Sequence, residues 1–269
     1  MRNQLIIFSK NRASQLHLLL ESLEKNSNLL FDDIKVIYTH TGEEYGKGYQ
    51  KLINVFKYVN FILEDNFSVN TLESIDDDIE YTTFMVDDNV LFKKIGISKD
   101  LVLGVIKEDV CCFSLRLGLN CTYSHPANLH YSLNSYKKSE NFIRINFRNE
   151  KGDFGYPLSV DGHIFKTSFI KNIISNLGNF TNPNVLETRL QFSLGDIPNN
   201  VYFLPESHLV GVPANIVNNT HPNRKGITFY FSEKELNDKY LDDINIKLES
   251  MNFKDIDGPH KEIKYIFDE

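Results

Sequence analysis

Two adjacent carboxylates and an amide, Asp87-Asp88-Asn89, follow a run of β-branched and aromatic residues at 81–86. Such a run is typical of a buried strand, so the three polar side chains are expected at its carboxyl end. That end of a strand is where open α/β sheets place their ligands. Adjacent carboxylates repel each other unless a cation neutralises them, and oxygen ligands suit Mg²⁺ or Mn²⁺. The motif could therefore hold a divalent ion that binds a diphosphate, or it could be only a solvated turn.

The residues before the acidic motif alternate between expected strands and helices. Three short apolar runs are typical of buried parallel strands: 4–9, 34–38 and 58–63. An amphipathic segment follows each run, and the first places four leucines on one helix face: Leu16, Leu19, Leu20 and Leu23. This alternation predicts a parallel sheet with right-handed crossovers, whose strand tips gather at one edge.

The turn after the first strand, Ser9-Lys10-Asn11-Arg12, lacks the glycines of a dinucleotide-binding or P-loop motif. Its Asn and Arg side chains could instead contact a base or a phosphate. Alternatively, Asn11 or Ser14 could cap the helix that follows.

The composition is that of a soluble globular protein, since 41% of the 269 residues are hydrophobic and 24% are charged. A net charge of −7 without a long basic run argues against nucleic acid as a partner. Three clustered cysteines without metal-site spacing favour a reducing compartment. We see no signal peptide and no apolar run of membrane-spanning length, so we expect a cytoplasmic protein without a transmembrane segment.

The order of these features resembles the nucleotide-sugar-binding half of GT-A glycosyltransferases, particularly the inverting family 2 type. The match lies in residues 1–92 and is carried by the Ser9-Lys10-Asn11-Arg12 turn, the leucine-rich helix and Val86-Asp87-Asp88-Asn89. The resemblance implies an α/β fold of the GT-A type, with a mainly parallel central sheet flanked by helices. It divides a single domain, 1–269, into a nucleotide-binding half, 1–92, and an acceptor-binding half with C-terminal elements, 93–269.

The same resemblance assigns roles in donor binding. It implies a set of nucleotide-binding residues: Phe8, Ser9, Asn11, Arg12, Thr39, Thr41 and Asp87, the last nearest the ribose. Asp88 would bind Mn²⁺ or Mg²⁺, with Asn89 and a C-terminal His221 as further candidate ligands. The family usually has a carboxylate where this chain has Asn89. Either Asp87 and Asp88 are the functional pair, or an amide replaces a metal-binding carboxylate.

The family's second half supplies the acceptor site and a catalytic base. A base is needed because an acceptor hydroxyl is a poor nucleophile near neutral pH. Two carboxylates compete for this role: Asp161, in a loop that could close over the donor sugar, and Glu187, at a helix start after Asn182-Pro183-Asn184. With Asn184 as the N-cap, Glu187 would be the N3 residue and could simply satisfy the capping geometry.

The resemblance therefore predicts a metal-dependent enzyme that moves a sugar from a nucleoside-diphosphate sugar, expected to be UDP-linked, to a glycan or glycolipid acceptor with inversion. A glycolipid acceptor would allow peripheral contact with a membrane. A sugar-1-phosphate nucleotidyltransferase is an alternative on the same fold, although the first turn lacks its glycine-rich loop. A catalytically silent binding module that has lost its metal is the other alternative, which Asn89 permits. The sequence leaves the donor sugar, the linkage and the oligomeric state open.

Overall fold

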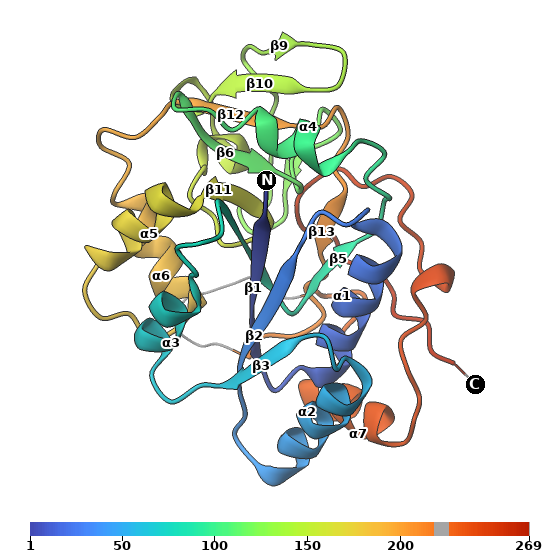
Figure 1. Ribbon diagram of the computed structural model, residues 1–269. Coiled ribbons are helices and arrows are strands. Elements are labelled where there is room, and N and C mark those ends of the chain that lie inside the picture. The colour runs from blue at the N-terminus through green and yellow to red at the C-terminus, as the bar shows by residue number, and fades with distance from the viewer. Residues whose placement is uncertain (218–225, 269) are drawn as a thin grey trace.

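The computed structural model describes residues 1–217 and 226–268, which form a central sheet with helices on both faces (Figure 1). The strands of this sheet are, in chain order, β1 (Asn3–Lys10), β2 (Asp33–Thr39), β3 (Asn60–Leu63), β4 (Tyr81–Val86), β6 (Val110–Ser114), β9 (Lys137–Lys138), β10 (Ile143–Asn146), β11 (His163–Lys166) and β12 (Asn200–Phe203). In the described part of the chain they lie in the order β3-β2-β1-β4-β11-β6-β12-β10-β9.

The sheet is parallel where the sequence predicted it. Strands β3, β2, β1 and β4 are joined by parallel pairings, and so are β6 and β12. Antiparallel pairings bring in β11, β10 and β9. The α/β class and the three strand–helix units before the acidic motif are thus confirmed, and the carboxyl ends of β1 to β4 lie at one edge.

Two helical layers cover the sheet. The helices are α1 (Ala13–Asn26), α2 (Glu43–Val55), α3 (Phe67–Ser74), α4 (Lys99–Gly104), α5 (Thr167–Ser175), α6 (Pro183–Gln191) and α7 (Glu233–Leu241). Figure 1 shows α1, α2 and α7 on one face and α3, α5 and α6 on the other. Alternate residues of β1 serve the two layers: Leu5 and Ile7 pack in the core under α1, whereas Ile6 and Phe8 pack in the core under α3.

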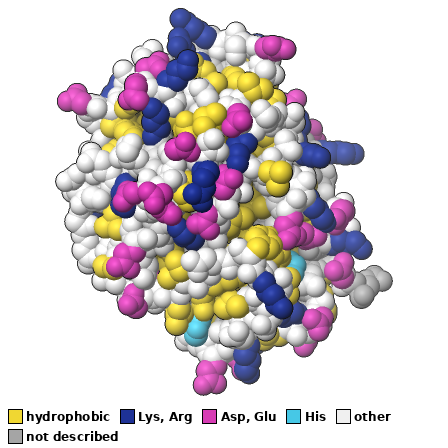
Figure 2. Space-filling view, in the orientation of Figure 1, with side chains coloured by type: hydrophobic (Ala, Val, Ile, Leu, Met, Phe, Trp, Pro, Cys, Tyr) yellow, Lys and Arg dark blue, Asp and Glu magenta, His cyan; other side chains and the backbone are white. Residues whose placement is uncertain are grey.

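Shorter elements complete the described chain. They are the strand pairs β5 (Asn89–Leu91) with β13 (Leu209–Gly211) and β7 (Tyr123–Ser124) with β8 (Leu129–His130), and 3-10 turns at Phe147–Asn149, Gly152–Gly155 and Leu248–Ser250. A search of the described helices for one long and apolar enough to cross a bilayer finds none. Acidic and basic side chains alternate over the face in Figure 2, so this face offers no extended basic surface for nucleic acid.

Helix α6 begins differently from the prediction. Its N-cap is Asn182, whose side chain accepts a hydrogen bond from Val185 N at 3.0 Å, and Pro183 occupies the first turn. The prediction that Asn184 caps this helix is wrong, because the rigid Pro favours the first helical position. Glu187 therefore lies beyond the capping positions, and its carboxylate is free for another role.

Candidate active site

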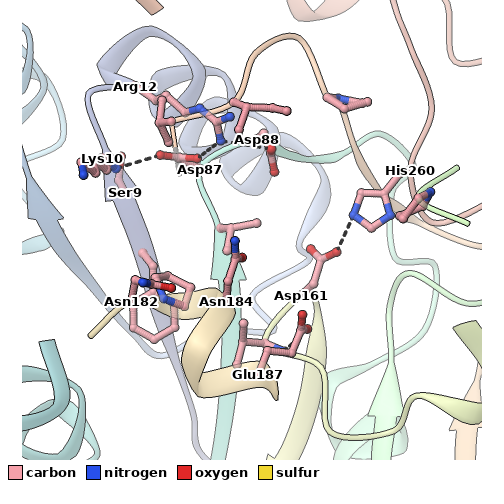
Figure 3. Close-up of a pocket in the computed structure, with 18 of the residues that line it drawn as sticks. Ser9, Lys10, Arg12, Asp87, Asp88, Asp161, Asn182, Asn184, Glu187 and His260 are labelled. Atoms are coloured by element: carbon pink, nitrogen blue, oxygen red, sulfur yellow. Dashed lines mark hydrogen bonds and ion pairs between the residues drawn. The ribbon is translucent and has the colours of Figure 1, made fainter. Parts of the chain in front are cut away.

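A pocket of about 730 Å³ opens at the carboxyl ends of β1, β2 and β4. Its opposite wall comes from the start of α6 and from loop segments 124–127, 152–161 and 213–217. Eight of the predicted site residues line it: Phe8, Ser9, Arg12, Thr39, Asp87, Asp88, Asp161 and Glu187. In Figure 3, Asp87 and Asp88 lie on one side of the pocket, and Asp161 and Glu187 lie on the other.

Arg12 holds the two acidic residues of the motif together. Its Nη1 donates to Asp87 Oδ1 at 2.9 Å and to Asp88 Oδ2 at 3.1 Å. Its Nε and Nη2 donate to the side-chain and backbone oxygens of Asn215 at 2.7 and 2.6 Å. Burial alone would lower the pKa of Arg12, but Asp87 and Asp88 raise it above its ordinary value. The buried guanidinium is therefore a permanent cation that positions the acidic motif.

The two carboxylates differ in what remains available to a ligand. Asp87 accepts from Arg12 through Oδ1 and from Lys10 N through Oδ2 at 3.0 Å, and its side chain is only 4% exposed. The Asp88 side chain is 19% exposed, and Arg12 engages its Oδ2. Burial raises the pKa of Asp88 to about 6; Arg12 opposes this shift, and the charges of Asp87 and Asp161 add to it. Asp88 is therefore the acidic residue most in need of a further cation.

Asn89 does not have the position expected of a metal ligand. It is fully buried as the first residue of β5, and its Oδ1 accepts a hydrogen bond from Val86 N at 3.2 Å. This bond closes the turn that presents Asp87 and Asp88, so the amide oxygen is turned away from the pocket. Asn89 thus stabilises the turn that carries the acidic motif, and its predicted role as a metal ligand stays untested. His221, the other predicted ligand, lies outside the described residues.

Asn11 and Thr41 bind each other and do not line the pocket. Asn11 Nδ2 donates to Thr41 Oγ1 at 2.9 Å, and Thr41 N donates to Asn11 Oδ1 at 2.9 Å. Asn11 has a φ of 58°, a left-handed conformation that Asn tolerates better than most residues. Their polar atoms join the tip of β1 to the segment after β2, and their direct contact with a nucleotide stays a prediction. Asn11 does not cap α1, whose N-cap position is Arg12.

The side of the pocket that carries Asp87 and Asp88 fits the divalent cation that the resemblance implies. Among the described residues, six acidic side chains line the pocket: Glu64, Asp87, Asp88, Asp153, Asp161 and Glu187. Only three lysines or arginines do so among these residues: Lys10, Arg12 and Arg116. A diphosphate would be repelled here unless a cation entered with it. No group of three His, Cys, Asp or Glu side chains forms a closed metal site in the part of the chain that is described. Mg²⁺ commonly binds only one or two protein carboxylates, together with phosphate oxygens of the ligand. Asp88 can supply such a carboxylate.

On the other side of the pocket, Asp161 is held by Arg116 and His260. Arg116 Nη1 donates to Asp161 Oδ2 at 2.6 Å, and His260 Nε2 lies 3.2 Å from the same oxygen. Arg116 also donates through Nη2 to Asp153 Oδ1 at 3.2 Å. Burial opposes ionisation of Asp161, yet Arg116 and His260 hold its pKa well below the usual range. Asp161 is therefore a stable anion and a weak base.

Glu187 has the opposite character. Its Oε1 accepts hydrogen bonds from Ser159 Oγ at 2.6 Å and from Val160 N at 3.1 Å. Burial raises the pKa of Glu187, Arg116 and Ser159 oppose the shift, and the nearby charge of Asp161 adds to it. A carboxylate with a raised pKa binds a proton more readily, so the geometry favours Glu187 over Asp161 as a general base.

Sequence reasoning missed several residues of this site. Arg116 carried one signal, a positive charge near the end of a largely apolar run, 110–117. Asn215 and His260 carried none, because loops with no periodicity bring them to the pocket. His260 is fixed by a backbone bridge to Gly211, where a side chain would collide with the imidazole ring.

The α/β fold and the acidic pocket at the strand tips are features of a GT-A-type glycosyltransferase, the class that the sequence resembles. No protein-family model matches the chain. A curated relative, the bifunctional glycosyltransferase pgtA of Dictyostelium discoideum, is 30% identical over 194 residues. The match covers 65% of this chain and 25% of the relative, so the chain spans about a quarter of that protein's length. The relative's name agrees with the predicted resemblance.

Solved structures of S. aureus TarS are also similar. One TarS structure has a TM-score of 0.49 and 14% identity, with 80% of this chain and 37% of that chain covered. TarS 1–349 in complex with UDP-GlcNAc has a TM-score of 0.46 and 14% identity, with 86% of this chain and 62% of that chain covered. Similarities of this size decide nothing about the activity of this chain.

Proposed function

We propose that the protein is a metal-dependent glycosyltransferase that moves a sugar from a UDP-linked donor to a hydroxyl of a glycan or glycolipid, with inversion at the anomeric carbon. One observation carries the proposal: two functionally different carboxylate groups face each other across one pocket (Figure 3). Asp87 and Asp88 lie at the tip of β4 under Arg12, and Glu187 lies opposite with a raised pKa. The similarity to the glycosyltransferase pgtA supports the same class.

On the donor side, the motif orients the nucleotide. Asp87 would accept a ribose hydroxyl, because each carboxylate oxygen has room for a second hydrogen bond beside Lys10 N or Arg12. Asp88 would hold the divalent ion, which when bound neutralises charge that develops on the leaving diphosphate. Arg12 holds both carboxylates in place and opposes the rise in the pKa of Asp88, so the binding geometry exists before the donor arrives.

On the acceptor side, Glu187 would take the proton of the attacking hydroxyl. The hydroxyl oxygen forms the new bond to the anomeric carbon while the bond to the diphosphate breaks on the opposite face, and the proton passes to Glu187. Ser159 and Val160 fix the carboxylate for this transfer. Asp161, already paired with Arg116 and in contact with His260, would orient the sugar or acceptor through its remaining acceptor capacity.

The three cysteines of the chain are free and buried, which suits an enzyme of a reducing compartment such as the cytoplasm.

The proposal is tested by a donor screen that measures nucleoside-diphosphate release from UDP- and GDP-sugars, with Mn²⁺ and with EDTA. We expect release from UDP-sugars that requires Mn²⁺ and increases with a suitable acceptor. Thermal-shift measurements with UDP, with and without Mn²⁺, provide a readout that does not depend on the acceptor. Absence of both release and metal-dependent stabilisation would reject the enzyme and leave a silent binding module.

A further inference from the structure

A row of three polar residues crosses the tips of β1, β2 and β3. Lys10 pairs with Thr39 in the β1–β2 register, and Tyr38 pairs with Leu63 in the β2–β3 register. Glu64 continues β3 by one residue, and its backbone N donates to Tyr38 O at 2.8 Å. Residues in register on parallel strands share one face of the sheet. Lys10, Thr39 and Glu64 accordingly line the same pocket side by side.

An apolar floor lies directly behind this row. Phe8 and Ile37, each two residues earlier on their strands, are also in register. Phe67, the first residue of α3, packs on Phe8 with ring centroids 5.0 Å apart. All three line the pocket and are buried. An apolar floor with a polar rim on one edge is suited to a flat heteroaromatic ring.

The two charged groups in this row, on Lys10 and Glu64, have no partner among the described residues. Among residues 1–217 and 226–268, no hydrogen bond or ion pair engages the Lys10 ammonium or the Glu64 carboxylate. Burial raises the pKa of Glu64 and the charge of Lys10 opposes that shift, so the two groups influence each other although no ion pair joins them. The Lys10 ammonium and the Glu64 carboxylate are separated at the edge of an apolar surface. They can therefore donate a hydrogen bond to, and accept one from, a ligand that lies between them.

We propose that Glu64 and Lys10 read the edge of the nucleobase and so determine which nucleoside diphosphate the enzyme binds. The inference rests on the proposed function, in which Asp87, on the next strand tip beyond Lys10, binds the ribose. An ionised carboxylate only accepts hydrogen bonds, and an ammonium only donates them. The pair therefore fits a ring N–H beside a carbonyl oxygen, with Glu64 on the N–H and Lys10 on the oxygen. Uracil presents this edge as N3–H and O4.

Cytosine tests this reading because it has the same ring with the two groups reversed. With the ribose fixed at Asp87, cytosine places an acceptor nitrogen against the Glu64 carboxylate and an amino group against Lys10. Both contacts leave polar groups without partners, which is the kind of mismatch that rejects an analogue most strongly. Guanine offers the same edge as uracil, N1–H and O6, on a larger base. The shared chemistry is thus a ring N–H next to a carbonyl.

The experiment is isothermal titration of the whole chain with UDP, CDP and GDP in the presence of Mn²⁺. We expect UDP to bind at least about 10-fold more tightly than CDP. In Glu64→Gln this ratio falls toward one, because an amide can both donate and accept. Glu140→Gln is the matched control: it makes the same change at an exposed residue that does not line the pocket, and leaves the ratio unchanged. Thermal melting of both variants checks that they fold.

Equal affinity for UDP and CDP in the unaltered protein would overturn the inference, as would a Glu64→Gln variant that keeps the full preference. GDP binding above UDP, with discrimination against CDP lost in Glu64→Gln, would support the reading and identify guanine as the base. Failure of every nucleoside diphosphate to bind would reject the proposed function itself, and is therefore distinguishable from a failure to discriminate.

Discussion

Glu187 Oε1 accepts a hydrogen bond from Ser159 Oγ at 2.6 Å, which ties the first turns of α6 to the loop that leads into β11. The backbone N of Val160 donates to the same oxygen at 3.1 Å. These bonds favour the ionised carboxylate, whereas burial disfavours it, and burial dominates in raising the pKa of Glu187. The result is a fixed carboxylate that accepts a proton more readily than an ordinary glutamate, as a general base must.

Replacement of Glu187 by Gln should lower kcat by about 10²–10⁴-fold, because the amide cannot take the proton of the acceptor hydroxyl. The affinity for UDP should stay nearly unchanged, since Glu187 lies across the pocket from Asp87 and Asp88. Steady-state kinetics and UDP titration measure the two effects separately. Glu206→Gln, which alters an exposed ion pair with Lys93, is the control. Normal turnover of Glu187→Gln would move the base to Asp161.

The pH dependence of kcat, measured at saturating donor and Mn²⁺ so that the bound cation keeps Asp88 ionised, distinguishes the two candidate bases. A base works only when ionised, so activity should fall as the pH decreases through the pKa of Glu187, which is raised above the ordinary value of 4.5. The pKa of Asp161 is lowered, so an enzyme that used Asp161 would keep its activity down to pH values below the usual carboxylate range. A profile that stays flat down to pH 4 would therefore contradict the assignment of Glu187.

Asp88→Ala should abolish both sugar transfer and the stabilisation of the protein by UDP with Mn²⁺. The reason is that Asp88 is the more exposed carboxylate of the motif and the one that fits the cation. Thermal shifts with UDP alone and with UDP plus Mn²⁺ give the readout. Asp77→Ala, a change in an exposed ion pair with Lys171, serves as the control. An Asp88→Ala protein that still needs Mn²⁺ to bind UDP would place the ion elsewhere.

Asp161→Asn should reduce the free energy of unfolding by about 3–5 kcal/mol at pH 7, because it removes one partner from a buried ion pair with Arg116. The folded-state pKa of Asp161 is depressed, so its stabilising effect is complete above the unfolded-state pKa. The effect is lost only as the pH falls toward the lower folded-state value. Urea unfolding at pH 7 and pH 5 should therefore give similar losses. Asp257→Asn, in the exposed pair with Lys261, should cost at most about 1 kcal/mol.

A smaller loss for Asp161→Asn, comparable with that of Asp257→Asn, would show that Asp153 alone is enough to neutralise Arg116.

The pattern of apolar and polar residues along the chain was enough to predict the side of the pocket formed by the strand tips. The apolar runs and the leucine spacing located β1 to β4 and α1, and so put Ser9, Arg12, Asp87 and Asp88 at the strand tips. This pattern could not predict the orientation of individual side chains. Asn89 points into the turn and Asn11 binds Thr41, because satisfying nearby backbone and hydroxyl groups outweighs exposure to the pocket.

The sequence by itself determined the class of fold, because hydrophobic periodicity within ten or twenty residues encodes strands and helices. Tertiary structure alone decided which of the two carboxylates has a raised pKa. That choice depends on Arg116, which is 45 residues from Asp161 and neutralises it, and on the burial of Glu187. The tertiary structure also places Asn215, 203 residues away in the chain, where it accepts a hydrogen bond from Arg12. Charges and dielectric surroundings are set by neighbours in space, and no local pattern specifies them.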